Sequence, residues 1–365
     1  MQSVKRADME RLAQYRQYLY THPRLTYLFF ELTDACNLSC LHCGSHAGPR
    51  NRTYLPITDV KMVLDQVALA YSPGTIMICL TGGEPLLHPN LFEIIAYARQ
   101  LGFSCGITTN GMLIDDQAAE ALVRSGVNTV TFSLDGLSDT HDRFRNQAGS
   151  FEKTLQGIRN LQQAAGKTIP TQITTVIHKQ NIHQLEELYA VVSGLGVDSW
   201  RVINMEPIGR ALENRELLLD GPQLRQLLSF IQECRFCPRS PMEVTYGCSH
   251  YVTENFERMV RDNYFLCGSG ILVASILCNG DIYSCLDIER REELIQGNIR
   301  THNFVDVWEN RFQPFRRNRT SDCEMCRQCE DRTFCCGDSG HTWDYETHTP
   351  LLCAKQLLDD LEVTI

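Results

Sequence analysis

Three cysteines near the start of the chain are spaced closely enough to hold a metal together. Cys36, Cys40 and Cys43 lie within eight residues, in TDACNLSCLHCGSHAG, with the spacing C-x3-C-x2-C. Structural zinc sites usually take four ligands in C-x2–4-C pairs, but no fourth cysteine follows here, and His42 and His46 are too crowded to replace it. Thiolates at such short spacings also hold iron–sulfur clusters. Because three thiolates on a four-iron cluster leave one iron open, the pattern favours chemistry on a bound substrate or cofactor.

The composition limits the class of protein. The 365 residues are enough for about two domains, and the net charge is −10 without a block rich in lysine and arginine. Since binding to nucleic acid needs a basic face, nucleic acid is not expected as the main partner. The charged N-terminus lacks the apolar centre of a signal peptide, and no apolar run reaches the ~20 residues that span a bilayer. The sequence therefore predicts a cytoplasmic protein without membrane contact, in a reducing compartment.

The 17 cysteines are unevenly distributed, because 12 of them lie at or after Cys234. In a reducing compartment, cysteines clustered at short spacings hold metals more often than disulfides. The last third of the chain is therefore expected to contain further metal sites. Cys79 and Cys105 lie in apolar runs and are expected to be small buried hydrophobes, while the isolated pair Cys234 and Cys237 has no assignment.

Short apolar runs alternate with helical patterns between residues 27 and 207. The runs expected to form strands are 27–33, 75–81, 104–109, 127–134, 171–177 and 198–205. The helical patterns are 58–71, 90–101, 115–125, 151–164 and 181–194, with further helices expected at 1–22, 221–235 and 353–361. This α/β alternation predicts parallel β-α-β units with right-handed crossovers, and six units form an open barrel or a doubly wound sheet. Functional residues of such folds gather at the C-terminal ends of the strands.

Four more motifs each stand at the end of an expected strand. They are TGGEPLLHP (81–89), TTNGMLI (108–114), SLDGLSDTHDRFR (133–145) and EPIGR (206–210). Paired glycines let a backbone approach a ligand closely, and a carboxylate after them can bind an ammonium group. Each motif taken alone also fits an ordinary turn, since Asn-Gly and Asp-Gly are common turn pairs.

CNLSCLHC after the first strand resembles the cluster motif of the radical S-adenosylmethionine (radical SAM) superfamily, in the version found in members with a C-terminal SPASM domain. The resemblance implies a partial (βα)6 TIM-like barrel in which Cys36, Cys40 and Cys43 hold a 4Fe–4S cluster. The open iron would chelate the amino and carboxylate groups of SAM. An electron from the cluster would cleave SAM to methionine and a 5′-deoxyadenosyl radical, which takes a hydrogen atom from the substrate.

The strand-end motifs match segments that line the SAM site in this superfamily. The GGEP motif would meet the methionine amino group, and residues after the fourth strand would bind the ribose hydroxyls and the methionine carboxylate. The turn after the sixth strand would lie at the adenine side. The SAM-binding residues implied in this way are Gly82, Gly83, Glu84, Pro85, Thr109, Asn110, Ser133, Asp135, Arg145 and Pro207.

The C-terminal cysteines resemble a SPASM domain, which binds one or two auxiliary iron–sulfur clusters. Six of the seven cysteine positions of its pattern are present, and Ser339 stands at the seventh. The resemblance implies one auxiliary cluster on Cys326, Cys329, Cys335 and Cys353, and another on Cys267 and Cys285 with Cys248 and Cys336 as partners. Cys323 and Asp338 are alternative replacements for the missing ligand, and a smaller or incompletely ligated cluster is a further alternative. Zinc is the alternative metal, since C-x2-C pairs also bind zinc.

The resemblance implies three parts: an N-terminal helix (1–22), a radical SAM partial barrel (23–235) and a SPASM domain (236–365). Members with SPASM domains mostly modify peptides and proteins, so we expect a peptide or protein substrate that is cross-linked, epimerised or oxidised. About 25 residues precede the first strand, too few for a leader-binding module. If the substrate has a leader, either a separate leader-binding protein or the barrel itself is expected to hold it. Flavodoxin or ferredoxin is the expected reductant.

Three alternative functions stay open. They are a small-molecule radical SAM dehydrogenase, an enzyme like the anaerobic sulfatase maturases, and a non-catalytic iron–sulfur or zinc protein. Related maturases place a catalytic Asp directly after the cysteine that matches Cys285. Here Leu286 follows, and Asp287 comes one residue later, which reverses the side-chain direction on a strand. Asp287 is nevertheless the candidate catalytic base.

Overall fold

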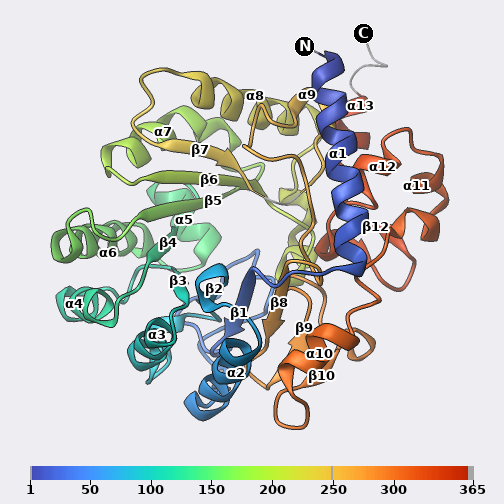
Figure 1. Cartoon of the computed structure of the whole chain (residues 1–365). Coiled ribbons are helices and arrows are strands. Elements are labelled where there is room, and N and C mark those ends of the chain that lie inside the picture. The colour runs from blue at the N-terminus through green and yellow to red at the C-terminus, as the bar shows by residue number, and fades with distance from the viewer. Residues whose placement is uncertain (1, 248–249, 361–365) are drawn as a thin grey trace.

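The computed structural model describes residues 2–247 and 250–360, which are built around one ten-stranded sheet (Figure 1). The strand order is β10-β9-β8-β1-β2-β3-β4-β5-β6-β7. The strands are β1 Tyr27–Glu31, β2 Met77–Thr81, β3 Ser104–Thr109, β4 Thr129–Ser133, β5 Thr171–Ile177, β6 Ser199–Asn204, β7 Glu243–Tyr246, β8 Val273–Ile276, β9 Asp281–Tyr283 and β10 Gly297–Asn298. Strands β1 to β7 and the β8–β1 pair are parallel, whereas β9 and β10 are antiparallel additions. A separate hairpin joins β11 (Trp343–Asp344) to β12 (Thr349–Pro350).

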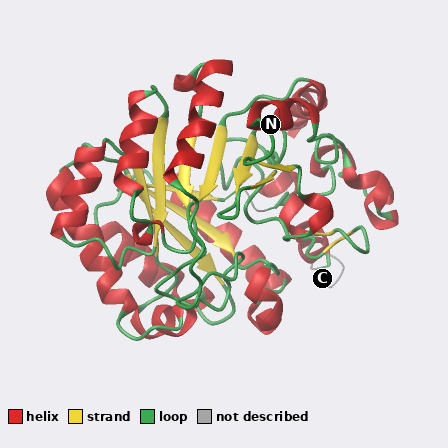
Figure 2. Ribbon diagram, turned by 90° about the horizontal axis from the view of Figure 1, so that it is seen from below, coloured by secondary structure: helices red, strands yellow, loops and turns green. Residues whose placement is uncertain are grey.

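Helices surround the outside of the sheet, as Figure 2 shows. The α-helices are α1 Gln2–Thr21, α2 Ile57–Ala70, α3 Leu91–Gln100, α4 Asp116–Ser125, α5 Ser138–Arg145, α6 Ser150–Ala165, α7 Leu185–Gly194, α8 Gly221–Phe236, α9 Thr253–Phe256, α10 Phe304–Asn310, α11 Glu324–Gln328, α12 Arg332–Cys335 and α13 Ala354–Asp359. The short 3-10 helices are η1 Pro73–Thr75, η2 Pro85–Leu87, η3 Ile182–Gln184, η4 Gly209–Leu217, η5 Glu292–Leu294, η6 Arg319–Asp322 and η7 Gly340–Thr342.

The partial barrel expected from the sequence is confirmed, and each of the six expected strands starts within two residues of its predicted position. Two features differ from the prediction. The segment after β4 forms α5, a polar helix in which Phe144 is the single large apolar residue. In addition, β7 and β8 extend the barrel sheet at its two sides. Each has four residues, which is too short for an alternating pattern to stand out.

Alternation along the strands decides which side chains are buried. In β2, Ile78 and Leu80 are buried among the surrounding helices, whereas Met77, Cys79 and Thr81 are partly exposed on the other face. Because side-chain direction alternates in every strand, each second residue of a barrel strand faces the interior. In β5, nearly all residues of both faces are buried. Cys105 of β3 is fully buried, as expected for a small hydrophobe. The same expectation is wrong for Cys79, which is partly exposed because its side chain points to the other face of β2.

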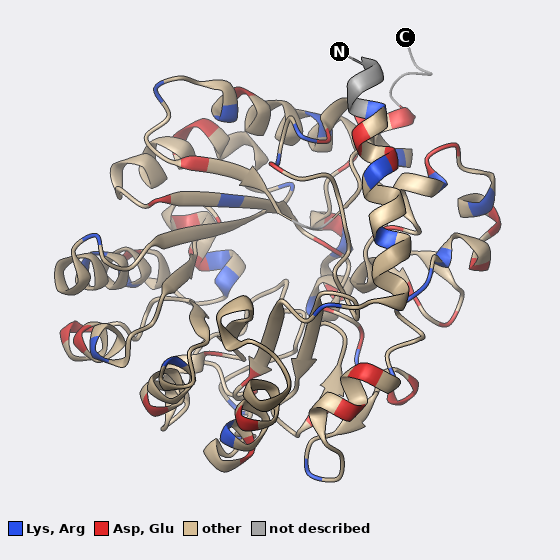
Figure 3. Ribbon diagram, in the orientation of Figure 1, with Lys and Arg blue, Asp and Glu red and all other residues tan. Residues whose placement is uncertain are grey.

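Charged residues lie mainly on helices and loops, and the strands carry few of them (Figure 3). None of the helices in the described ranges combines the length and apolar character that a membrane crossing requires.

Helix α1 packs along the C-terminal segment (Figure 1). Its Met9 and Ala13 share a buried cluster with Phe265 and Phe334. The buried Arg16 guanidinium donates one hydrogen bond to the Phe334 carbonyl at 2.7 Å and another to the Phe265 carbonyl at 2.6 Å. The first and last parts of the chain are therefore fixed to each other through main-chain acceptors beside the C-terminal cysteines.

Replacing Arg16 by methionine should loosen the segment around Phe334. Two charge-assisted hydrogen bonds are lost, each worth about 1.5–3 kcal/mol. We expect faster amide hydrogen exchange across α12 in Arg16→Met than in the native protein. Arg11→Met, which changes an exposed arginine of the same helix, is the matched control. Equal exchange rates in the two variants would contradict the bracing role of Arg16.

Candidate active site and auxiliary cysteine cavities

The loop that follows β1 carries the first three cysteines to the C-terminal end of the barrel. Cys36 and Cys40 are buried, and Cys43 is partly exposed. They open on a cavity of about 200 Å³. Its lining consists of Cys36, Leu38, Cys40, His42, Cys43, Gly44, Ala47, Thr81, Gly82, Gly83, Thr108, Thr109, Asn110, Ser133, Arg145 and Arg210.

The two glycines after β2 lie directly against the cysteine loop. The Gly83 amide donates to the Thr33 carbonyl at 2.6 Å, and the Glu84 amide donates to the Ala35 carbonyl at 2.9 Å. A Cβ on Gly83 would lie 2.1 Å from the Ala35 oxygen, and one on Gly82 would lie 2.5 Å from the Thr33 oxygen. Gly82 also has a φ of +149°, which favours glycine. No larger residue fits at either position without moving the cysteine loop.

Glu84 fixes the end of β3 rather than lining the cavity. Its fully buried carboxylate accepts hydrogen bonds from the Thr109 hydroxyl at 2.7 Å, the Asn110 amide at 2.9 Å and the Leu86 amide at 3.1 Å. Burial raises the pKa of Glu84, and these three donors oppose the rise. The side-chain amide of Asn110 donates a hydrogen bond to the side chain of Asn37, in the cysteine loop, at 2.8 Å. The ends of β2 and β3 and the cysteine loop thus form one hydrogen-bonded unit.

A buried ion pair lies on the other side of the cysteine loop. Arg145 of α5 contacts Asp135 at 2.5 Å and donates to the Cys40 sulfur at 3.6 Å. The other Asp135 oxygen accepts from the Val176 amide at 2.8 Å. Burial opposes the charge on Arg145, but Asp135 and Cys40 raise the pKa of the guanidinium above its usual value. Arg145 thus brings positive charge to a cysteine sulfur at the cavity wall.

The His42 ring lies in a stack of three rings beside the cavity. It stacks on Phe144 with a centroid distance of 4.2 Å, and Phe144 stacks on His178 at 4.0 Å. Burial lowers the pKa of His42, so the ring is neutral. Its buried Nδ1 has no hydrogen-bond partner among the described residues. A ligand in the cavity could supply that partner.

Arg210, the last residue of EPIGR, holds the cysteine loop from the end of β6. Its guanidinium donates to the Cys40 carbonyl at 2.7 Å and to the Ala47 carbonyl at 2.9 Å. A Cβ on the neighbouring Gly209, whose φ is +52°, would lie 2.4 Å from the Cys43 oxygen. Arg210 is not among the site residues predicted from the sequence, although the motif that contains it is. Its position directly after a strand-end turn is the sequence signal that could have identified it as a site residue.

The cavity fits an iron–sulfur cluster with a ligand beside it. Burial raises the pKa of Cys36 to about 12 and also raises that of Cys40. Such thiols become thiolates readily only beside a strong positive charge, which iron provides. Of the ten residues predicted to bind SAM, six line the cavity, namely Gly82, Gly83, Thr109, Asn110, Ser133 and Arg145. Glu84 and Asp135 support that lining from behind, and Pro85 is buried beside Glu84.

A recess of about 190 Å³ adjoins this cavity, and Gly44 lines both. Pro207, Asp287 and His341 lie in the wall of the recess. A Cβ on Gly44 would lie 3.9 Å from Asp287 Oδ1, so the Asp287 carboxylate lies next to the cysteine loop. The Asp287 side chain is accessible from the recess, yet desolvation by the surrounding protein raises its pKa. Pro207 therefore lies on the recess side of Gly44.

Buried charges connect this recess to the C-terminal segment. His341 contacts Glu206 at 2.6 Å, and the other Glu206 oxygen lies 3.6 Å from His250. His250 Nδ1 lies 2.9 Å from Asp338, which also accepts from the Tyr251 amide at 3.0 Å. Although burial opposes protonation, Glu206 raises the pKa of His341 to about 10. Asp338 is one of the alternative cluster ligands predicted from the sequence, but both of its carboxylate oxygens are engaged in these contacts.

Four C-terminal cysteines line one cavity of about 530 Å³. They are the four assigned together from the sequence, Cys326, Cys329, Cys335 and Cys353. Burial raises the pKa of Cys326 to about 12 and that of Cys353 to about 11, and the neighbouring thiols add to both shifts. No three of the described His, Cys, Asp and Glu side chains are close enough to hold a single metal ion. The four thiols instead surround a shared space.

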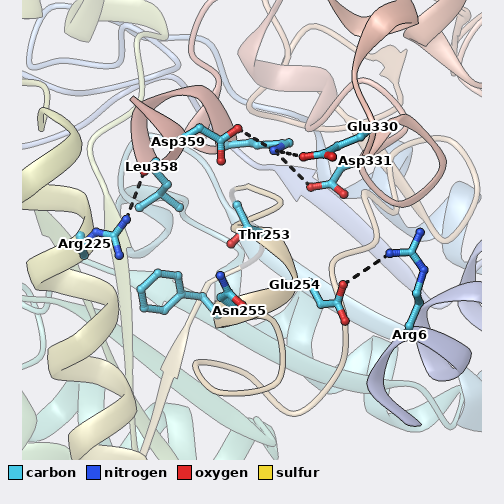
Figure 4. Close-up of a pocket in the computed structure, with 11 residues that line it drawn as sticks. Arg6, Arg225, Thr253, Glu254, Asn255, Glu330, Asp331, Leu358 and Asp359 are labelled. Carbon is cyan, nitrogen blue, oxygen red and sulfur yellow. Dashed lines mark hydrogen bonds and ion pairs between the residues drawn. The ribbon is translucent and has the colours of Figure 1, made fainter. Parts of the chain in front are cut away.

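An ion-paired recess of about 250 Å³ lies beside the four-cysteine cavity (Figure 4). Lys355 of α13 contacts Asp359 at 2.6 Å, Glu330 at 3.3 Å and Asp331 at 3.6 Å. Glu330, Lys355 and Asp359 line both spaces. These contacts hold α13, which follows Cys353, against the segment that carries the other cysteines.

The second group of predicted C-terminal ligands is less compact. Cys267 and Cys336 line a small cavity of about 20 Å³ together with Cys335. The Gly340 amide donates to the Cys267 sulfur at 3.4 Å. Cys285 does not line that cavity, and Cys248 lies outside the described residues. The assignment of these ligands stays a prediction.

Gly83→Ala should disrupt the first cysteine site, because its Cβ would meet the Ala35 carbonyl. We expect anaerobically reconstituted Gly83→Ala to lose more than about tenfold in SAM cleavage, equivalent to at least about 1.4 kcal/mol. Gly74→Ala is the matched control, because its Cβ would have no atom within 4 Å. Retention of native cleavage by Gly83→Ala would show that this contact does not hold the site.

Cys326→Ala should remove iron from the C-terminal cavity while leaving SAM cleavage measurable. Since Cys326 shares its cavity with three other thiols, one cluster's iron should be lost. Iron per chain and the 5′-deoxyadenosine formed from SAM would be measured together. Cys237→Ala, which alters an exposed cysteine, should leave both values unchanged. Native iron content in Cys326→Ala would refute the shared-cluster assignment.

Comparisons with known proteins agree with this arrangement. Residues 30–192 match the model of the radical SAM superfamily, and residues 267–330 match that of an iron–sulfur cluster-binding domain, SPASM. The chain is 30% identical to the AdoMet-dependent heme synthase of Methanosarcina barkeri, over 86% of this chain and 90% of that protein. It is 27% identical to an Fe-coproporphyrin III synthase of the same organism, over 85% of this chain and 82% of that protein.

A peptide-modifying enzyme and a solved structure are also similar. The mycofactocin maturase MftC of Mycobacterium tuberculosis is 27% identical, over 85% of this chain and 77% of that protein. Streptococcus suis SuiB bound to S-adenosylmethionine shares the fold with a TM-score of 0.70 and 20% identity, over 86% of this chain and 73% of SuiB. SAM, a 4Fe–4S cluster and auxiliary iron–sulfur clusters are thus the cofactors. The chain belongs to the radical SAM superfamily, as an enzyme with a C-terminal SPASM domain.

Proposed function

We propose that this enzyme uses a 5′-deoxyadenosyl radical to take a hydrogen atom from a side chain of a tetrapyrrole. The basis of this proposal is that the chain is similar to a heme synthase over 86% of its own length and 90% of the length of that relative. The ring atoms of a porphyrin are sp² carbons and nitrogens. The C–H bonds that an alkyl radical attacks readily are therefore those of its side chains.

The residues of the site have distinct roles in this reaction. A cluster on Cys36, Cys40 and Cys43 would supply the electron that cleaves SAM. Gly82 and Gly83 let the loop after β2 lie directly against the cysteine loop, since a Cβ at either position would collide with the carbonyl of Thr33 or Ala35. Arg145 contributes positive charge next to Cys40. These groups bind and orient SAM while the barrel end shields it from water.

The substrate is proposed to reach SAM through the recess beside Gly44. This recess shares a wall with the cysteine cavity, so a side chain entering it would approach the place where the radical forms. Asp287 and His341 line the recess and can hold or transfer protons there. The ion pair between His341 and Glu206 fixes the orientation of the imidazole.

The test is a turnover assay with iron coproporphyrin III that carries deuterium on its side chains. The reconstituted enzyme would be supplied with SAM and a reductant under anaerobic conditions. We expect deuterium in the 5′-deoxyadenosine and a change in porphyrin mass, because the radical takes its hydrogen atom from the substrate. A reaction without SAM is the control. Unlabelled 5′-deoxyadenosine together with unchanged porphyrin would exclude this substrate.

A peptide or protein is the second candidate substrate, favoured by the similarity to MftC. The reaction would then be a cross-link, an epimerisation or an oxidation, with Asp287 as the base in a sulfatase-type oxidation. A leader-binding protein and a flavodoxin or ferredoxin as reductant belong to the same proposal. Deuterium transfer from a labelled precursor peptide, without transfer from the porphyrin, would favour this candidate.

A further inference from the structure

Arg201 lies in β6 with its side chain directed into the barrel. Its neighbours Trp200 and Val202 are fully buried, and Trp200 packs edge-on against Phe230 of α8 with a centroid distance of 6.2 Å. The face of β6 with Trp200 and Val202 is therefore the helix face. Because successive side chains alternate, Arg201 points to the opposite face, where it is partly exposed.

The Arg201 guanidinium has no carboxylate partner within ion-pair distance in the described part of the chain. Its Nε donates to the Thr174 hydroxyl on β5 at 3.1 Å, which is a neutral acceptor. Arg145 and Arg261, by contrast, contact the carboxylates of Asp135 and Glu257 at 2.5 and 3.4 Å. The buried Arg16 and Arg316 have no such carboxylate, but their terminal nitrogens donate to main-chain carbonyls. The terminal nitrogens of Arg201 have no hydrogen-bond partner among the described residues, so a ligand carboxylate could pair with this charge.

The position of Arg201 in the sheet brings it near the cysteine cavity. In the sheet, Arg201 is paired with Thr174 of β5, and Thr174 is paired with Ser133 of β4. Ser133 lines the cysteine cavity, so Arg201 lies at the same level of the barrel as one of its walls. The charge of Arg201 lowers the pKa of Cys79, which burial raises to about 12; Cys79 is two residues before Thr81 in the cavity wall. Arg201 itself does not line the cysteine cavity. Its positive charge is thus next to the SAM site without being part of it.

We propose that Arg201 binds a carboxylate of the substrate inside the barrel and so positions a nearby C–H bond toward the SAM cavity. The inference rests on the proposed function, because carboxylate-bearing side chains are a feature of coproporphyrin. A guanidinium binds a carboxylate through two parallel N–H donors, which fixes orientation as well as position.

The experiment measures turnover of iron coproporphyrin III and of its tetramethyl ester by the holoenzyme. Arg201→Gln should raise the KM for the free acid by about tenfold to a hundredfold, the value of a lost charge-assisted hydrogen bond. Arg201→Lys should recover part of that loss. With the ester, the native enzyme and Arg201→Gln should have similar KM values, since no carboxylate remains to be bound.

Controls separate this role from folding and from the proposed function. Arg124→Gln removes the same charge from an exposed position on α4 and should leave the KM unchanged. Iron content and 5′-deoxyadenosine formed without substrate should be native in Arg201→Gln, because Arg201 lies outside the SAM cavity. If Arg201→Gln matches Arg124→Gln with the free acid, the carboxylate site is refuted while the proposed function stands. If the native enzyme turns over neither porphyrin, the proposed function is refuted and the inference with it.

Discussion

The close contact between two stretches of backbone determines the geometry of the active site. Gly83 and Glu84 donate their amides to the carbonyls of Thr33 and Ala35, so the loop after β2 holds the loop with the three cysteines. This contact requires that no side chain intervene. Glu84 then accepts hydrogen bonds from Thr109 and Asn110, and the Asn110 side chain donates a hydrogen bond to Asn37 in the cysteine loop. Three separate strand ends are thereby joined around one cavity.

The C-terminal segment is joined to this site by the sheet and by charge. Strand β8 pairs in parallel with β1, the strand directly before the first cysteine loop. Glu206 after β6 contacts His341, and His250 connects Glu206 to Asp338 beside the C-terminal cysteines. Buried ionic contacts add little net stability but fix relative positions. The arrangement keeps the auxiliary cysteines at a fixed position relative to the SAM cavity, as electron transfer between them would require.

Much of this organisation could be predicted from the sequence, because it depends on local signals. The cysteine triplet, the paired glycines and the alternating apolar runs identified the barrel and its functional end. The resemblance to SPASM domains implied the grouping of Cys326, Cys329, Cys335 and Cys353, and the four line one cavity. Contacts between distant segments gave no such signal. The pairing of Asp135 with Arg145, the anchoring by Arg210 and the His341–Glu206 contact each depend on how strand ends meet in space.

The most direct measurement is the formation of 5′-deoxyadenosine from SAM by a variant with Cys36, Cys40 and Cys43 all replaced by alanine. Reconstituted native and variant proteins would be reduced anaerobically, and the product would be quantified beside the iron content. The variant should form no 5′-deoxyadenosine and should keep its auxiliary iron, since its C-terminal cysteines are unchanged. Formation of 5′-deoxyadenosine by the variant at the native rate would contradict the assignment of this cavity as the site of SAM cleavage.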